Sequence, residues 1–275
     1  MKLAKTTDKG PVHGFYTSIV GIGLIVWLSL VLAPLAQASA GSFGVDDIDR
    51  VGVQQSLGKI WIRSERADDL EQICNAVYVR ESIWVTSQHC FPEGGATYFL
   101  AQPERTWDEI AQVEIVSNDR DLAFFQTLHR KEGKPLSAPS HFPSKGEKLS
   151  LVAFNGEGSS KLRVVPLELV GRIDRLRTTE GWTFRDLIVT VSVTQRSTCR
   201  GDSGAPILSG DQLVGLHTAG ESGNQCDIGS GKYSAESYIH FNSAEIQEVL
   251  SRFTHADDET DSFSSLAVCP LACLE

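Results

Sequence analysis

The most constraining feature of this chain is a short motif at residues 198–206, which reads Thr-Cys-Arg-Gly-Asp-Ser-Gly-Ala-Pro. It places Ser203 next to an aspartate and between Gly201 and Gly204. A serine hydroxyl becomes a useful nucleophile only beside a base, and acyl transfer also needs backbone N–H donors for the oxyanion. Because surface turns share this composition, the motif indicates catalysis only if the chain also supplies a base and an orienting acid.

Two upstream motifs supply a histidine and an aspartate, so that the three motifs follow the order His, Asp, Ser along the chain. Residues 84–90 read Trp-Val-Thr-Ser-Gln-His-Cys, and residues 119–125 read Asp-Arg-Asp-Leu-Ala-Phe-Phe. Together the three motifs resemble those of the trypsin/chymotrypsin-like serine endopeptidases over about residues 51–253. Ser87 and Gln88 stand where the family favours two alanines, which removes no catalytic group. Three motifs in order are far more specific than one.

The resemblance implies an all-β fold of two six-stranded antiparallel β-barrels, with the active site between them and a C-terminal helix. Ser203 would then attack the scissile carbonyl, His89 would transfer the proton, and Asp121 would hold the His89 tautomer. The N–H groups of Gly201 and Ser203 would bind the oxyanion. Asp119 is an alternative acid, and Asp121 is preferred because Leu-Ala follows it, as in the family. Taken alone, His89 would suggest a buried structural histidine.

The apolar pattern along the chain agrees with this fold class. Short β-rich runs separated by turn signals favour an all-β barrel or sandwich. They lie at residues 59–62, 76–79, 82–86, 122–125, 149–154, 162–170, 187–193, 205–208, 212–217 and 237–241. Residues 131–148, rich in Lys, Gly and Pro, are expected to link barrel one (about 51–130) to barrel two (about 149–241). Residues 242–253 carry a helical apolar stripe behind a capping Asn or Ser.

Residues 1–40 are predicted to be a signal peptide. Three lysines precede an apolar run at about residues 19–36, and small residues then offer cleavage after Ala38 or Ala40. The alternative is that the segment is not cleaved and serves as a membrane anchor, because the apolar run is just about long enough to span a bilayer. We therefore expect a secreted or periplasmic protein with no membrane contact after cleavage. A net charge of −10 without any Lys/Arg run argues against a nucleic-acid partner.

The polar lead-in at residues 41–50 has two interpretations. Zymogens of the family are often cut after a basic residue, so Arg50-Val51 fits an activation site. The freed Val51 amine would then pair with Asp202 and complete the oxyanion hole, as the resemblance implies. Alternatively, residues 45–47 together with Arg50 loosely resemble the start of bacterial glutamyl endopeptidases, which are processed differently. The sequence leaves both open.

Six cysteines in an exported chain suggest disulfides. The resemblance implies a Cys74–Cys90 bridge beside the histidine loop and a Cys199–Cys226 bridge beside the specificity pocket. Each would add about 3 kcal/mol on the loop-entropy model. No Cys-x-x-Cys pair and no cofactor motif is visible, so neither a metal nor a cofactor is expected.

The C-terminal tail, residues 254–275, begins with an acidic stretch and is expected to be flexible. Its two cysteines, Cys269 and Cys273, have no counterpart in the family. They pair with each other, join two chains or stay free, and the sequence does not decide between these outcomes.

The residues expected to contact substrate differ from those of trypsin itself. Ser197 stands six residues before the nucleophile, where trypsin-type enzymes carry an aspartate, so a preference for Arg or Lys is not indicated. His217 precedes residues 218–220, which correspond to the strand that lines the substrate backbone in the family. His217 together with Thr198 resembles the glutamyl endopeptidases, and also the viral 3C-type proteases, which recognise Gln and use a cysteine nucleophile.

A buried Glu side chain needs hydrogen-bond donors and preferably a positive charge. His217 and the Thr198 hydroxyl can donate, and Arg200 can add charge at the rim. The predicted substrate-binding residues are Thr198, Arg200, His217, Thr218 and Gly220. Alternatively, His217 is a satisfied core histidine. The acidic chain and Glu236, if it approaches the pocket, argue against a Glu preference.

We therefore predict a monomeric secreted serine endopeptidase that acts on proteins or peptides and cleaves after Glu, or after Asp or Gln. One rival is a catalytically silent trypsin-like fold that serves as a binding module, although all three triad members are present. A second rival is a non-proteolytic acyl hydrolase, although the two-barrel motif order favours peptide bonds.

Overall fold

The computed structural model describes ten segments of the chain. They are residues 50–63, 70–92, 96–102, 107–129, 134–139, 141–154, 161–178, 181–221, 226 and 231–260. The predicted signal peptide, the lead-in up to residue 49, Cys269 and Cys273 lie outside these segments. No helix within the described segments is long and apolar enough to cross a membrane.

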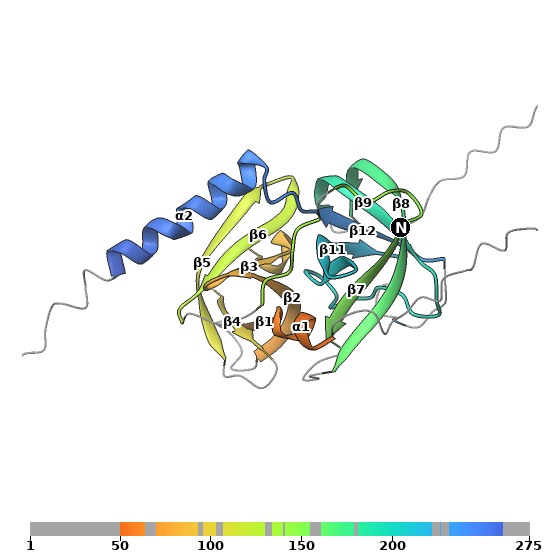
Figure 1. The fold of residues 1–275 in the computed structure, drawn as a ribbon. Helices are drawn as coiled ribbons and strands as arrows, with labels where there is room; N and C mark the ends of the chain where they lie inside the picture. The colour runs from red at the N-terminus through yellow and green to blue at the C-terminus, as the bar shows by residue number, and fades with distance from the viewer. Residues whose placement is uncertain are drawn as a thin grey trace, which may run out of the picture. The chain divides into compact units, whose positions relative to one another are not determined.

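The described chain forms two closed antiparallel barrels of six strands each (Figure 1). In the first, the strand order is β1-β2-β3-β6-β5-β4. Its strands are β1 (Leu57–Arg63), β2 (Leu70–Arg80), β3 (Ile83–Thr86), β4 (Thr97–Ala101), β5 (Asp108–Ser117) and β6 (Arg120–Thr127). This architecture confirms the predicted all-β, two-barrel fold.

The second barrel has the same circular arrangement, in the order β10-β11-β12-β9-β8-β7. Its strands are β7 (Lys148–Phe154), β8 (Leu162–Arg177), β9 (Thr183–Ser192), β10 (Pro206–Ser209), β11 (Gln212–Gly220) and β12 (Tyr233–Tyr238). Strand β7 begins at Lys148, the last residue of the expected linker.

Both faces of the strands nearest the barrel interface are buried. All four residues of β3 are buried, and its side chains alternate between two hydrophobic clusters. Trp84 points into the first barrel and packs with Phe125, whereas Ile83 and Val85 belong to a cluster that also contains Val152 of β7. This alternation follows from the two-residue period of a strand, and it joins the two barrels through one shared core.

Two helices flank the barrels, and one of them was not predicted. Helix α1 (Arg50–Gln55) precedes β1, and its Val53 is buried in the shared core. Helix α2 (Ala244–Thr260) follows the second barrel in sequence but packs against β5 and β6 of the first (Figure 1). It continues beyond the predicted end at residue 253, because no Gly or Pro follows there to end a helix.

Several strands differ from the predicted runs: β2, β8 and β9 are longer than predicted, and β4, β5 and β12 were missed or misplaced. Strand β4 contains a short apolar run at residues 98–101 that was not recognised as a strand, and in β5 the polar residues Glu109, Gln112 and Glu114 interrupt the apolar ones. Strand β12 begins at Tyr233, earlier than the run predicted at 237–241. Its buried residues include Ser234 and Glu236, which hydrogen-bond to neighbouring strands, so an apolar pattern could not reveal it.

Candidate active site

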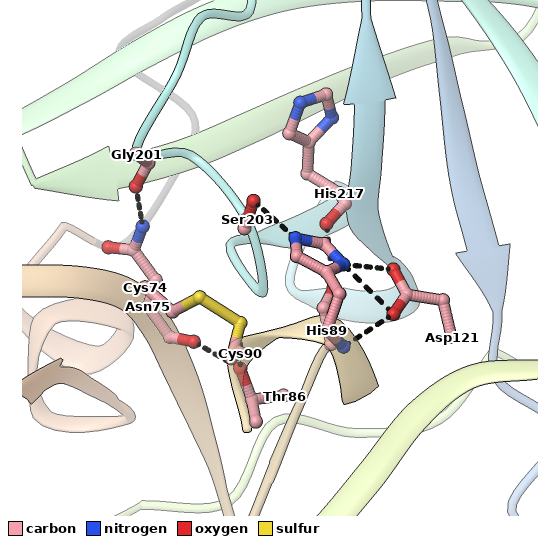
Figure 2. Close-up of a disulfide and its surroundings, with 10 residues drawn as sticks. Cys74, Asn75, Thr86, His89, Cys90, Asp121, Gly201, Ser203 and His217 are labelled. Atoms are coloured by element: carbon pink, nitrogen blue, oxygen red, sulfur yellow. Dashed lines mark hydrogen bonds and ion pairs between the residues drawn. A yellow bond between two sulfur atoms is a disulfide. The ribbon is translucent and has the colours of Figure 1, made fainter. Parts of the chain in front are cut away.

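His89 lies between Ser203 and Asp121 (Figure 2). Its Nε2 is 2.8 Å from Ser203 Oγ, and its Nδ1 is 2.9 Å from Asp121 Oδ2. The backbone N–H of His89 also donates to Asp121 Oδ1 at 3.0 Å. Because an ionised carboxylate only accepts, Nδ1 carries the proton and Nε2 is left to accept from the serine hydroxyl. This arrangement can deprotonate Ser203 as it attacks a carbonyl.

The two barrels supply different members of this cluster. His89 lies in η1 (Gln88–Cys90), directly after β3, and Asp121 lies at the start of β6, with its side chain fully buried. Ser203 lies in the turn before β10, in the second barrel. The His89 side chain is 24% exposed, so the base stays accessible to substrate while the acid does not.

Asp119, the alternative acid, lies elsewhere. Its carboxylate accepts from Arg185 Nε at 2.6 Å and from Ser117 Oγ at 2.9 Å, and its side chain is 54% exposed. Slight burial would raise the pKa of Asp119, but the hydrogen bonds from Ser117 and Arg185 outweigh it and lower that pKa. The structure therefore brings Asp121, and not Asp119, against His89.

The turn that carries Ser203 is pinned to the first barrel by Asn75 of β2. Asn75 Nδ2 donates to the Gly201 carbonyl at 2.8 Å, and the Asn75 N–H donates to the Ser203 carbonyl, also at 2.8 Å. Gly201 and Gly204 have φ values of +93° and +73°. A Cβ atom on Gly204 would collide with the carbonyl oxygen of Asn75 and with Thr86 Oγ1, so only glycine fits there.

Two backbone donors in this turn are available to a ligand. Among the described residues, neither the Gly201 N–H nor the Ser203 N–H has an acceptor. Both belong to the turn whose carbonyls Asn75 holds, so the pair is fixed beside Ser203 Oγ. Paired N–H groups of this kind can stabilise an oxyanion formed when the serine attacks a carbonyl.

In this uncut chain the carboxylate of Asp202 binds Arg163 of β8, and its pairing with a freed Val51 amine stays a prediction for a chain cut after Arg50. Arg163 Nη2 reaches both Asp202 oxygens, and Oδ2 also accepts from the Cys199 N–H at 2.8 Å. Arg163 Nη1 donates to the Ser197 carbonyl at 2.9 Å. A buried cation from within the barrel therefore neutralises Asp202 before any cleavage, and Val51 belongs to α1.

Both predicted disulfides are present. Cys74–Cys90 joins β2 to η1, directly behind His89 (Figure 2), and Cys199–Cys226 joins the nucleophile turn to the segment before β12. Cys74, Cys90 and His89 are also close enough together to hold a metal. Both thiols are consumed by the disulfide, however, and His89 is bonded to Asp121 and Ser203, so these residues do not fit a metal ion.

The departure from the family at Ser87 has a structural role. Ser87 Oγ donates to the carbonyl of His217 at 2.9 Å, and the same carbonyl accepts from the Gly204 N–H at 3.0 Å. The hydroxyl that replaces a family alanine thus ties the segment before His89 to β11. The backbone of His217 lies beside the nucleophile turn, while its ring points away from His89 and Asp121 (Figure 2).

The ring of His217 is held by a buried glutamate. Nδ1 lies 2.8 Å from Glu236 Oε2, and both side chains are almost fully buried, with exposures of 4% and 0%. Burial alone would lower the pKa of His217, but the charge of Glu236 and its hydrogen bond outweigh this effect and raise that pKa above its usual value. Asp202 adds to the rise, and Arg163 opposes it.

The structure brings three of the predicted substrate-binding residues together. A Cβ atom on Gly220 would collide with Thr198 Oγ1 and would lie 3.6 Å from His217 Cε1. Gly220 is exposed, whereas Thr198 and His217 are buried behind it. Thr218 is instead buried with its hydroxyl 2.9 Å from Ser237 Oγ, and Arg200 is exposed in the nucleophile turn.

Sequence reasoning missed Asn75 and Arg163, and it treated Glu236 only as a residue opposing Glu recognition. Asn75 and Arg163 are buried polar residues within strands that otherwise bury mostly apolar side chains, whereas Glu236 lies in a strand whose buried residues are mostly polar. That contrast is the available signal, because buried polar groups need partners. It does not say which partner, since Arg163 and Asn75 reach groups far away in the sequence.

The fold is shared with solved structures of low sequence identity. The Rv3671c protease from M. tuberculosis, active form, is 16% identical with a TM-score of 0.55, covering 73% of this chain and 82% of that one. Human heparin binding protein is 17% identical with a TM-score of 0.53, covering 72% and 92%. Kallikrein-related peptidase 10 is 13% identical with a TM-score of 0.51, covering 77% and 98%.

No curated protein matches the sequence. A family model described as Trypsin, however, matches residues 52–241, which includes all three motifs and both barrels. The match spans well over half of the chain, and so this protein belongs to the trypsin family.

Proposed function

We propose that this protein is a secreted serine endopeptidase that hydrolyses peptide bonds through an acyl-enzyme on Ser203. The observation that carries the proposal is the 2.8 Å contact between His89 Nε2 and Ser203 Oγ, with His89 Nδ1 bonded to the buried Asp121. A nucleophile and base within hydrogen-bond reach, with the base oriented by a third group, is the arrangement that activates a serine.

The reaction follows from these contacts. As Ser203 Oγ attacks the scissile carbonyl, its proton passes to His89 Nε2, and Asp121 stabilises the imidazolium. The carbonyl oxygen becomes an oxyanion that accepts from the N–H groups of Gly201 and Ser203. His89 then gives the proton to the leaving amine, the C–N bond breaks, and an ester on Ser203 remains. Water activated by His89 hydrolyses that ester and restores the serine.

We further propose a preference for Glu before the cut. Thr198 Oγ1 and the His217 ring converge behind Gly220, on the strand that in this family lines the substrate backbone. Both can donate hydrogen bonds to a carboxylate, and the raised pKa of His217 favours the charged ring. On sequence alone, Glu236 argued against a preference for Glu. In the structure its carboxylate instead lies at Nδ1 of the His217 ring and leaves Nε2 for a ligand.

Secretion is proposed from the predicted signal peptide together with the two disulfides, since such bridges persist in oxidising compartments. A silent binding module is a weaker candidate, because the His89–Ser203 contact is formed and the Gly201 and Ser203 N–H groups have no described acceptor.

The test is digestion of a diverse peptide library by the secreted protein, beside its Ser203→Ala variant. We expect cuts after Glu that disappear in the variant, and labelling of Ser203 by a fluorophosphonate. Labelling without peptide cleavage, but with hydrolysis of small esters, would instead indicate an acyl hydrolase. Absence of labelling and cleavage would favour the binding module.

A further inference from the structure

The His217–Glu236 pair is part of a buried polar network that the proposed triad does not use. His217 of β11 and Glu236 of β12 are direct partners in the antiparallel register. Glu236 Oε1 accepts from Thr190 Oγ1 of β9 at 2.9 Å, and Thr190 Oγ1 lies 2.8 Å from Ser234 Oγ. Three adjacent strands thus hold one carboxylate against Nδ1 of the histidine.

This contact decides what the other ring nitrogen can do. Because a carboxylate only accepts, Nδ1 carries a proton whenever Glu236 is ionised. Nε2 is then a donor when the ring is charged and a bare acceptor when it is neutral. Within the described segments, Nε2 has no hydrogen-bond partner, and the adjoining Cε1 faces the Gly220 and Thr198 side.

We propose that Glu236 is a positioning residue that makes substrate choice depend on pH, because it forces His217 to offer Nε2 as a donor in acid and as an acceptor in alkali. In the donor form, Nε2–H binds the carboxylate of a Glu side chain. In the acceptor form, it repels a carboxylate and accepts instead from the –NH₂ of a Gln side chain. The inference rests on the proposed function, since it concerns the residue before the scissile bond.

The charged groups around His217 set the pH at which its ring loses a proton, and they move it above the usual value for a histidine. Glu236 on β12 and Asp202 in the nucleophile turn favour the charged ring, whereas burial and Arg163 on β8 oppose it. The balance raises the pKa of His217, so the donor form persists to a higher pH than in an ordinary histidine. The groups that contact Glu236 from β9 and β12, Thr190 and Ser234, are uncharged hydroxyls.

The experiment compares two peptides that differ only in Glu or Gln before the cut. We would measure kcat/KM for both from pH 6 to 10 and follow the ratio of Glu to Gln cleavage. Any effect of pH on the catalytic steps that both peptides share cancels in the ratio. The ratio should stay level at low pH and then fall by up to about tenfold per pH unit above the pKa of His217.

Glu236→Gln keeps the shape of the side chain but removes its charge. The fall in the ratio should then begin at a lower pH, because the charge of Glu236 that raises the pKa of His217 is gone. Glu168→Gln is the matched control, because Glu168 lies on β8 and pairs with the exposed Lys148, and it should leave the profile unchanged. NMR titration of the His217 ring in both proteins gives a readout that does not depend on cleavage.

The possible outcomes separate this inference from the proposed function. A fall in the ratio that moves to lower pH in Glu236→Gln, together with the NMR titration of His217, supports the inference. Cleavage after Glu with a ratio that stays constant from pH 6 to 10, or an unchanged profile in Glu236→Gln, overturns the inference and leaves the protease intact. Failure to cut either peptide, without labelling of Ser203, overturns the proposed function and the inference with it.

Discussion

Arg163 and Asp202 form a buried ion pair directly behind the turn that carries Ser203, with side-chain exposures of only 8% and 3%. This pair already neutralises the carboxylate that a new N-terminal amine was expected to bind. Activity should therefore not require a cut after Arg50. An Arg50→Gln variant should be labelled by a fluorophosphonate at Ser203 as fast as wild type. Labelling that appears only after cleavage before Val51 would contradict this prediction.

Removing the Arg163 cation should destabilise the folded protein, because Asp202 would be left as an unpaired buried charge. We expect Arg163→Met to lower the free energy of unfolding by about 3–5 kcal/mol, the usual loss when one partner of a buried pair is removed. Urea denaturation measures this change. Arg175→Met, an exposed substitution on the same strand, is the matched control and should change stability by less than about 0.5 kcal/mol. Equal effects of the two substitutions would show that the pair does not stabilise the turn.

The choice of acid can be tested by two substitutions of the same kind. Asp121→Asn should reduce kcat by about 10⁴, because the amide favours the wrong His89 tautomer. Asp119→Asn should leave kcat within about twofold, because Asp119 bonds to Arg185 and Ser117 rather than to His89. Steady-state kinetics on one peptide gives both values. The reverse ranking would make Asp119 the acid.

Asn75 should affect catalysis although it is not placed to touch substrate. Its amide holds the Gly201 carbonyl at 2.8 Å, and so it fixes the turn whose N–H groups are proposed to bind the oxyanion. Asn75→Ala should lower kcat by about 10- to 100-fold, less than the loss of an oxyanion donor itself, and should leave KM nearly unchanged. A loss confined to KM would indicate a role in substrate binding instead.

Much of the fold could be predicted because its signals are local. The three motifs lie at strand ends, and runs such as the one in β7 alternate between two buried faces. Strand β5 was missed because the polar residues Glu109, Gln112 and Glu114 interrupt its apolar residues, and α1 because a six-residue helix has too little periodicity to detect. The position of β12 was misjudged because two of its buried residues, Ser234 and Glu236, are polar.

In the candidate site, too, residues marked by local motifs could be predicted, whereas contacts between distant strands could not. His89, Asp121 and Ser203 were identified from their neighbours in sequence, which the structure brings within hydrogen-bond distance. The partners of Asp202 and His217 could not be found like this, because each contact joins strands whose register only the folded barrel sets. The resemblance implied, under one of the two interpretations of the lead-in, an N-terminal amine freed by cleavage as the partner of Asp202, whereas in the uncut chain the barrel supplies an arginine.

The His217–Glu236 pair should also make stability depend on pH. The pKa of His217 is raised in the folded state, so the stabilisation is complete below its unfolded pKa of about 6.5 and is lost as pH rises through the folded value. Wild type should therefore lose unfolding free energy between about pH 6.5 and the raised pKa, by about 1.4 kcal/mol for each pH unit in that interval. Urea denaturation at several pH values measures this slope.

Glu236→Gln should flatten the slope, because the charge that raises the pKa of His217 is gone, whereas Glu168→Gln should leave the slope unchanged. If wild type and Glu236→Gln lose stability in parallel as pH rises, another group carries the dependence, and His217 does not gain its charge from Glu236.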